Sequence, residues 1–176
     1  MTGEHKQTQS VFLSFKRVMD ALLAGVAIVA LAPVMLLVAI AVKLDSRGPA
    51  LFRQERLGLG GKPFMMVKFR SMTVGAEAAG VYVTEGDARV TRVGEFIRRT
   101  SLDELPQLFN ILRGDMSIIG PRPVLTYHPW PLAEYTDEQR RRFEVRPGLS
   151  GWAQVNGRKT VEWPQRLEFD VEYVEK

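Results

Sequence analysis

The sequence of 176 residues contains no cysteine. This absence excludes a disulfide framework and is compatible with a reducing compartment. The chain has no internal repeat and no low-complexity tract. It also has no basic run interleaved with aromatic residues, the pattern typical of a nucleic-acid-binding surface, so we expect no nucleic-acid partner. The length suggests one domain, or one domain with an appendage.

Positive charge is in excess. The chain has 24 Lys and Arg against 20 Asp and Glu, which gives a formal net charge of +4 and a pI of about 9.6. Such a balance favours anionic partners, such as phospholipid headgroups or nucleotides.

One long stretch, residues 21–42, carries no charge at all. As a straight helix it would measure about 33 Å, just enough to cross a bilayer. The run is too long for a signal peptide, and too long for a buried core helix in so small a chain. A single membrane span is therefore the simplest interpretation of this stretch.

Two features of the same stretch argue against a span. Pro33, near its middle, removes a helical donor and clashes with the carbonyl of Val29. Basic residues flank both ends, and the positive-inside rule assigns both flanks to the cytoplasmic side. These flanking residues are Lys16, Arg17, Lys43, Arg47, Arg53 and Arg56. We therefore expect a re-entrant helix-break-helix over residues 18–44, broken at Pro33, between a polar or amphipathic segment (1–17) and a cytoplasmic domain (45–176).

Asp20 opens the apolar stretch, where a buried charge would be costly. We expect it at the interface beside Lys16 or Arg17, in a structural role.

The residues after this stretch predict a β-hairpin. Residues 51–57 and 64–72 alternate like strands around the glycine-rich turn 58–61. That turn lacks the spacing of a phosphate-binding loop. Lys68 and Arg70 alternate with Val67 and Phe69, so both cations should project from one face of the second strand. An ordinary solvated face is the simplest explanation for them.

Residues 101–113 predict a helix with acidic residues on its first turn. Ser101 and Glu104 have the spacing of a capping box, and Gly114 stands where a helix usually stops. Asp103 and Glu104 then lie at the positive end of the helix, where they complement its dipole. This structural role explains both acids without any function, but it leaves the charged Gly/Pro loop at 114–123 unexplained.

Shorter helices are expected elsewhere. One is predicted at 91–99, a helical turn at 76–79, a helix from Thr136 (capping box with Gln139) to Val145, and a last helix over 161–174. Arg140, Arg141 and Arg142 would form either a solvated face or a contact with anionic lipid. These elements predict an α+β chain: a membrane hairpin, a β-hairpin and several short helices.

Four motifs resemble one known family in their order and length. They are residues 98–107 (RRTSLDELPQ), 114–117 (GDMS), 120–123 (GPRP) and 146–155 (RPGLSGWAQV). The chain from about Lys16 onward resembles the bacterial sugar transferases, which are monotopic phosphoglycosyl transferases with a re-entrant anchor.

The resemblance implies an enzyme of the bacterial inner membrane, with its catalytic domain on the cytoplasmic face. The implied reaction moves a sugar 1-phosphate from a nucleotide diphosphate sugar, expected to be a UDP-sugar, to polyprenyl (undecaprenyl) phosphate. This step starts glycan, exopolysaccharide or O-antigen assembly through a covalent aspartyl-phosphosugar intermediate. Membrane lipid is a further expected partner, and homo-oligomerisation stays open.

The implied site joins two acids to several cations. Asp103 would be the nucleophile, kept ionised by the helix N-terminus and nearby arginines. Asp103 and Glu104 would be the candidate ligands of Mg²⁺, the expected cofactor. The candidates for gripping substrate phosphates are Lys68, Arg70, Arg98, Arg122 and Arg146.

Two rival functions remain at this point. One is a membrane-anchored binding or scaffold module, in which Asp103 and Glu104 only cap a helix. The other is a glycosyltransferase that moves the sugar without its phosphate and therefore releases a nucleoside diphosphate.

Overall fold

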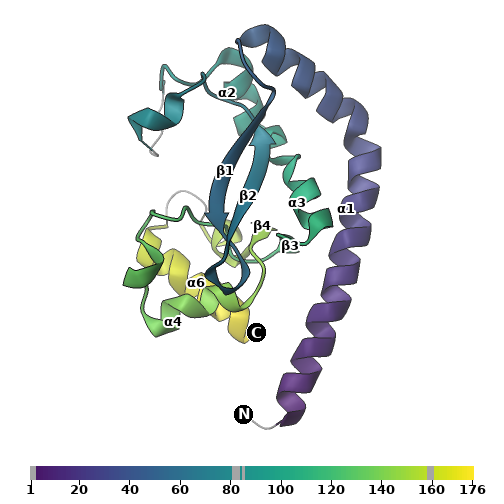
Figure 1. The fold of residues 1–176 in the computed structure, drawn as a ribbon, viewed down its shortest axis with the longest axis vertical. Coiled ribbons are helices and arrows are strands. Elements are labelled where there is room, and N and C mark those ends of the chain that lie inside the picture. The colour runs from purple at the N-terminus through teal and green to yellow at the C-terminus, as the bar shows by residue number, and fades with distance from the viewer. Residues whose placement is uncertain (1–2, 81–83, 85, 158–160) are drawn as a thin grey trace.

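The computed structural model describes residues 3–80, 84, 86–157 and 161–176, with the backbone alone for residues 3–11. The architecture is α+β, as expected (Figure 1). In chain order, its α-helices and strands are α1 (Gly3–Asp45), β1 (Leu51–Leu57), β2 (Pro63–Phe69), α2 (Arg92–Arg99), α3 (Gln107–Arg113), β3 (Ser117–Ile119), α4 (Asp137–Arg140), β4 (Gly148–Ser150), α5 (Trp152–Val155) and α6 (Trp163–Glu175).

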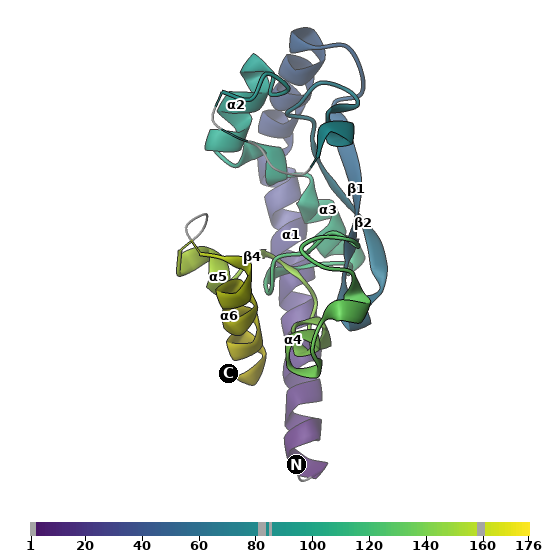
Figure 2. The same ribbon diagram turned by 90° about the vertical axis from the view of Figure 1, so that its left-hand side faces the viewer.

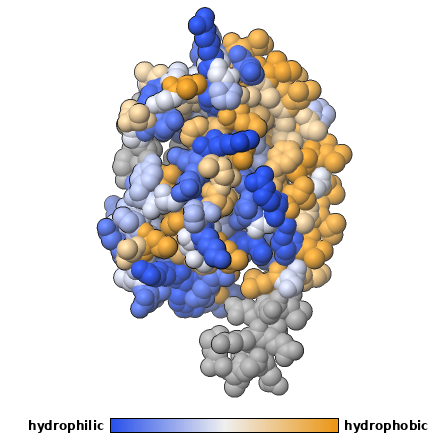
Figure 3. Space-filling view, viewed as in Figure 1, coloured by the Kyte–Doolittle hydropathy of each residue, from blue (hydrophilic) through white to orange (hydrophobic). Residues whose placement is uncertain are grey.

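The long helix α1 runs along one side of the molecule, and the rest of the chain packs against its other side (Figures 1 and 2). Over Phe12–Asp45 it is long and apolar enough to cross a membrane, and little of its most apolar stretch is buried. A core helix of a soluble protein would be mostly covered. Apolar side chains gather over α1 along one edge of the surface, and hydrophilic ones gather over the hairpin and α4 (Figure 3).

The structure does not confirm the predicted break at Pro33. The backbone of α1 stays helical from Gly3 to Asp45 with Pro33 inside it, and the C-terminal part of the helix bends over towards α2 (Figure 1). Proline has a backbone φ that suits a helix, so the loss of one hydrogen bond can be absorbed by a bend.

Polar contacts tie the first part of α1 to the domain. The carboxylate of Asp20 pairs with Lys16 Nζ at 3.1 Å and accepts hydrogen bonds from Ser117 Oγ (2.7 Å) and Ile118 N (3.1 Å). The ion pair with Lys16 agrees with the structural role predicted for Asp20, but the side chain is buried against the domain, where the sequence indicates that a charge would be costly.

A second set of contacts holds the opposite end of α1. Arg70 donates to Ser46 Oγ at 2.6 Å and to the carbonyl of Pro49 at 2.7 Å. The Asp45 carboxylate accepts a hydrogen bond from Val93 N at 3.0 Å, at the start of α2. The same domain therefore grips both ends of the apolar stretch.

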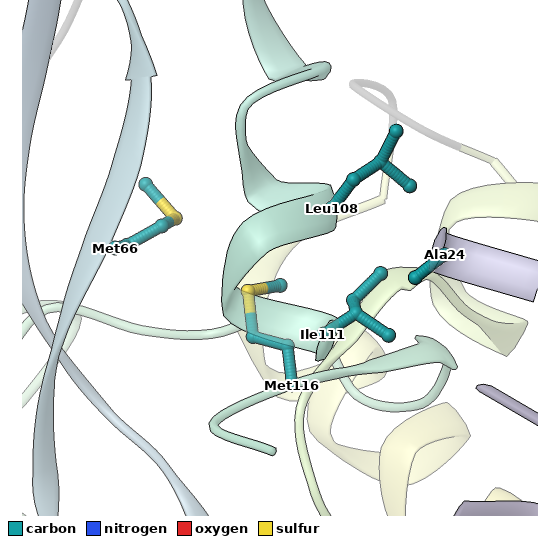
Figure 4. Close-up of a cluster of buried hydrophobic side chains, with 5 residues drawn as sticks. All are labelled: Ala24, Met66, Leu108, Ile111 and Met116. Carbon is teal, nitrogen blue, oxygen red and sulfur yellow. The ribbon is translucent and has the colours of Figure 1, made fainter. Parts of the chain in front are cut away.

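The predicted hairpin is present, with Leu51 opposite Phe69 and Leu57 opposite Pro63. A buried cluster joins it to the helices, since Met66 of β2 faces α3 and Leu108 and Ile111 of α3 point towards Ala24 of α1 (Figure 4). Asn110 of α3 is fully buried, and its side chain accepts from Val67 N (3.0 Å) and donates to the Met65 carbonyl (2.8 Å). The hairpin and α3 therefore form one unit.

The C-terminal part packs beside this unit. Strand β3 pairs in parallel with β4, with Ser117 opposite Gly148. The capping box of Thr136 and Gln139 is confirmed, although α4 ends at Arg140 and continues as a 3₁₀ turn, Arg141–Glu144. Both expectations for the arginine run are wrong at Arg142, which is buried and pairs with Asp170 of α6 at 2.8 Å.

Candidate functional site

Asp103 and Glu104 lie on a single 3₁₀ turn, Leu102–Glu104, and not on the first turn of α3. The predicted capping box is wrong, because Ser101 has a φ of 59° and its side chain caps nothing. Pro106 has no amide hydrogen, so a helix that began at Ser101 would lose a backbone hydrogen bond one turn later. Helix α3 instead begins directly after Pro106, where the missing hydrogen costs nothing. It ends at Gly114, whose φ of 101° suits a left-handed cap, as predicted.

This turn gives the two carboxylates different surroundings. Glu104 is partly exposed and pairs with Arg122 at 2.6 Å. Asp103 is 9% exposed and, within the described residues, forms no ion pair and accepts no hydrogen bond from another residue. Burial is the main cause that raises the pKa of Asp103, and the charge of Glu104 adds to it. This corrects the expectation that the helix N-terminus and arginines would hold that pKa down.

Lys68 lies beside Asp103 on the inner face of the hairpin. Its ammonium is 5.3 Å from the centre of the Phe52 ring, and no ion pair to it occurs in the described parts of the chain. Burial, followed by the positive charge of Arg56, lowers the pKa of Lys68 to about 8. Asp103 raises that pKa and Arg122 and Arg98 lower it, so all of these charges lie within electrostatic reach of Lys68.

The structure thus brings five predicted residues together: Lys68, Arg98, Asp103, Glu104 and Arg122. Sequence reasoning missed one further cation, Arg56, which it treated only as a flanking charge. The strand register could have found it, because Arg56 lies opposite Phe64 and Lys68 lies opposite Phe52, so both cations share one face of the hairpin.

Arg122 projects from a loop whose backbone is held at successive carbonyls. The carbonyl of Pro121 accepts from Gly148 N (2.8 Å), that of Arg122 from the side chain of Arg142 (2.7 Å) and that of Val124 from Leu57 N (2.9 Å). Arg142, which is paired with Asp170, therefore holds the backbone at Arg122 in place. Burial raises the pKa of Asp170 to about 6, against the opposite pull of Arg142. A loop fixed in this way presents its arginine in one place.

Two predicted phosphate ligands lie outside this group. Arg70 is buried and donates to Ser46 and Pro49 at the end of α1, one residue beyond the end of β2. Arg146 donates from Nε to the carbonyl of Gly114 at 2.9 Å and thereby holds the turn after α3. The contacts of both arginines are structural, and they give no support to a role in phosphate binding.

Magnesium fits this site only in combination with a substrate. The described residues contain no cluster of three or more His, Cys, Asp or Glu side chains that could hold a metal by itself. Asp103 and Glu104 are two adjacent carboxylates, and the charge of Glu104 disfavours the ionised form of Asp103. Mg²⁺ commonly binds one or two carboxylates together with substrate phosphate oxygens, which matches this pair.

The fold and site define an α+β protein with an apolar anchor-like helix and a buried carboxylate among cations. The chain belongs to the bacterial sugar transferase family, whose model matches residues 11–176. The resemblance noted in the sequence is therefore confirmed.

Three relatives bear names that state their reactions. A protein named UDP-glucose:undecaprenyl-phosphate glucose-1-phosphate transferase from Caulobacter vibrioides is 48% identical, over 91% of this chain and 62% of its own length. One of the same name from Escherichia coli is 47% identical, over 90% of this chain and 36% of its own. A UDP-N-acetylgalactosamine-undecaprenyl-phosphate N-acetylgalactosaminephosphotransferase from Aeromonas hydrophila is 47% identical, over 82% of this chain and 34% of its own length. The chain thus spans between about a third and about three fifths of these relatives.

The lowered pKa of Lys68 predicts a pH profile. If Lys68 holds substrate phosphate as a cation, kcat/KM falls as the pH rises through about 8, because a lysine is charged only below its pKa. Lys68→Arg keeps the charge to higher pH, so the alkaline limb moves upward by more than about one unit. Lys62→Arg, in the exposed hairpin turn, serves as the control. An alkaline limb that stays in place in Lys68→Arg contradicts this role.

Proposed function

We propose that this protein transfers a sugar 1-phosphate from a nucleotide diphosphate sugar to polyprenyl phosphate. The observation that carries the proposal is the buried carboxylate of Asp103, which has no partner in the described structure and lies within reach of Lys68 and Arg98. The names of the relatives support a UDP-sugar as donor and undecaprenyl phosphate as acceptor. Two different sugars occur in those names, so the sugar itself stays open.

In the first proposed step, Asp103 is the nucleophile. A carboxylate oxygen of Asp103 forms a bond to the phosphorus that bears the sugar. The bond from that phosphorus to the bridging oxygen breaks, and its electron pair leaves on the nucleoside monophosphate. Little solvation of the carboxylate has to be removed for this attack, because the side chain is already buried in the protein, and the same burial raises its pKa.

In the second proposed step, the aspartyl phosphosugar is the donor. An oxygen of polyprenyl phosphate attacks the same phosphorus, and the electron pair of the broken bond returns to Asp103. The product is a polyprenyl diphosphosugar, as expected for the start of glycan, exopolysaccharide or O-antigen assembly. Lys68, Arg98 and Arg122 would neutralise phosphate charge in both steps.

Asp103 and Glu104 would hold Mg²⁺ together with the substrate phosphates. When bound, the ion would withdraw charge from the phosphoryl oxygens. Glu104 also orients Arg122 through their 2.6 Å ion pair.

The placement of α1 supports a membrane anchor with both ends on one side. Asp20 and Asp45 are both bonded to the same domain, although the helix between them is about 38 Å long. A helix that crossed the bilayer would carry one of these contacts to the opposite side. We propose that the apolar face of α1 enters one leaflet of the bacterial inner membrane from the cytoplasmic side. The polyprenyl tail and the soluble nucleotide sugar could then reach one site.

The rival functions are less well supported. A scaffold in which Asp103 caps a helix conflicts with the geometry, because the side chain lies on a 3₁₀ turn and α3 begins at Gln107. A transferase that releases a nucleoside diphosphate has no counterpart among the names of the three relatives.

Covalent catalysis predicts an adduct that forms without the acceptor. Protein incubated with Mg²⁺ and UDP-sugar, but no polyprenyl phosphate, should release uridine monophosphate. The peptide containing Asp103 should then carry the mass of a sugar phosphate. Asp103→Asn should lose both signals, since its amide is nearly isosteric but a poor nucleophile.

Asp137→Asn is the matched control, because Asp137 is an acid on the first turn of α4 and should keep both signals. Asp103→Asn with ordinary turnover, or release that requires both substrates together, would rule out the covalent step.

The proposed anchor predicts the labelling of introduced cysteines. The natural chain has none, so single cysteines at Thr8 and Arg47 report without background. Both should react with an impermeant maleimide from the cytoplasmic side only, like a reference cysteine at the exposed Glu138. Labelling of Thr8→Cys from the opposite side would show that α1 crosses the membrane.

A further inference from the structure

Arg56 shares the inner face of the hairpin with Lys68 but lies nearer to the glycine-rich turn. Between them, Met66 of the same face is buried in the core cluster with α3. Charge is therefore placed on both sides of an apolar contact, on a sheet face that otherwise packs against the protein.

The contacts of Arg56 do not neutralise its charge. One terminal nitrogen donates to Gln54 Oε1 at 2.6 Å, and the other donates to the Pro123 carbonyl at 3.3 Å. Its Nε is buried and has no hydrogen-bond partner among the residues that the structure describes. No acid in the described parts of the chain forms an ion pair with it. Burial followed by the charge of Arg122 lowers the pKa of Arg56 to about 10, so it still carries its charge at neutral pH.

Such an arrangement of like charges is unfavourable by itself. A buried cation is normally paired, and the cationic neighbours of Arg56 are Arg122 and Lys68. The nearest acid within electrostatic reach, Glu104, is already paired with Arg122. A multiply charged anion bound between these side chains would remove the imbalance.

The charges around Lys68 differ in their relation to Asp103. Lys68 is within electrostatic reach of both Arg56 and Asp103, but Arg56 is not among the charges that shift the pKa of Asp103, which are Glu104, Lys68 and Arg98. In-line attack by Asp103 places the leaving oxygen on the far side of the reacting phosphorus. A phosphoryl group attacked by Asp103 would then lie beside Lys68 and Arg98. Arg56, which acts on Lys68 but is not among the charges that act on Asp103, would lie towards the departing group.

We infer that Arg56 binds the phosphate of the departing nucleoside monophosphate, an assignment that rests on the function proposed above. When the bond to the bridging oxygen breaks, its electron pair adds one negative charge to that phosphate. A guanidinium fixed by Gln54 and Pro123 in a site with little water stabilises this charge without rearranging. Arg56 would thus favour both the first step and the retention of the nucleotide product.

A purely structural role for Arg56 makes a different prediction. If Arg56 only ties Pro123 to the hairpin, a neutral amide could make the same bond to the carbonyl. Arg56→Gln separates the two roles because it retains a donor and loses the charge. Arg56→Lys retains the charge and loses the planar fork. Arg53→Gln is the matched control, since Arg53 lies on the exposed outer face of the same strand.

The test measures the direct binding of uridine monophosphate, the sugar-phosphate transfer rate and the thermal midpoint for each protein. We expect Arg56→Gln to bind uridine monophosphate at least about tenfold more weakly, with an unchanged thermal midpoint and a lower sugar-phosphate transfer rate. The affinity of Arg56→Lys for uridine monophosphate should lie between those of Arg56→Gln and the natural protein, and Arg53→Gln should match the natural protein.

Unchanged affinity in Arg56→Gln overturns the inference, as does an equal loss of affinity in Arg53→Gln. A natural protein that binds uridine monophosphate through Arg56 but transfers no sugar phosphate would contradict the proposed function and leave the phosphate site standing. If Arg56→Gln fails to fold, an Arg56→Lys protein with the affinity of the natural one overturns the inference.

Discussion

The site depends on one buried amide, that of Asn110. Strand β2 pairs with β1 on one side only, so its other edge presents backbone groups that need partners. The side chain of Asn110 bonds to two of them, Val67 N and the Met65 carbonyl, and also to the carboxylate of Asp115 at 3.1 Å. These bonds fix the hairpin against α3 and the turn that precedes it. Lys68 and Asp103 can therefore come close although 35 residues separate them in sequence.

Contacts within the fold fix the positions of the charged residues around Asp103. Arg122 is fixed through its own carbonyl by Arg142, which is paired with Asp170 on the last helix. Arg70 clamps the end of α1 at the point where β2 finishes. Lys68 and Arg56 form no ion pair within the described residues. Preorganised charge of this kind is what the proposed phosphoryl transfer requires.

The sequence predicted most local elements, because their signals lie within a few residues. The hairpin, the capping box of Thr136 and the glycine stop at Gly114 are confirmed for this reason. The prediction of a capping box at Ser101 is wrong, because Ser101 adopts a left-handed conformation between the end of α2 and the 3₁₀ turn. Whether Pro33 bends or breaks α1 depends on contacts along the whole domain, which no local pattern contains.

The same limit applies to the cations of the site. Arg70 and Lys68 look equivalent in the alternating strand, yet Arg70 falls beyond its end and meets Ser46. Arg142 looks solvent-exposed in a run of three arginines, but its partner Asp170 is 28 residues away. Long-range pairing decides which arginine serves the fold and which remains available to a ligand.

In the proposed reaction the sugar phosphate passes through Asp103 in two in-line displacements. The most direct measurement is the stereochemical course at phosphorus, using a UDP-sugar made chiral at the phosphorus that bears the sugar. Each in-line displacement inverts that centre. Two displacements through Asp103 give net retention in the polyprenyl diphosphosugar, whereas net inversion would rule out the Asp103 intermediate.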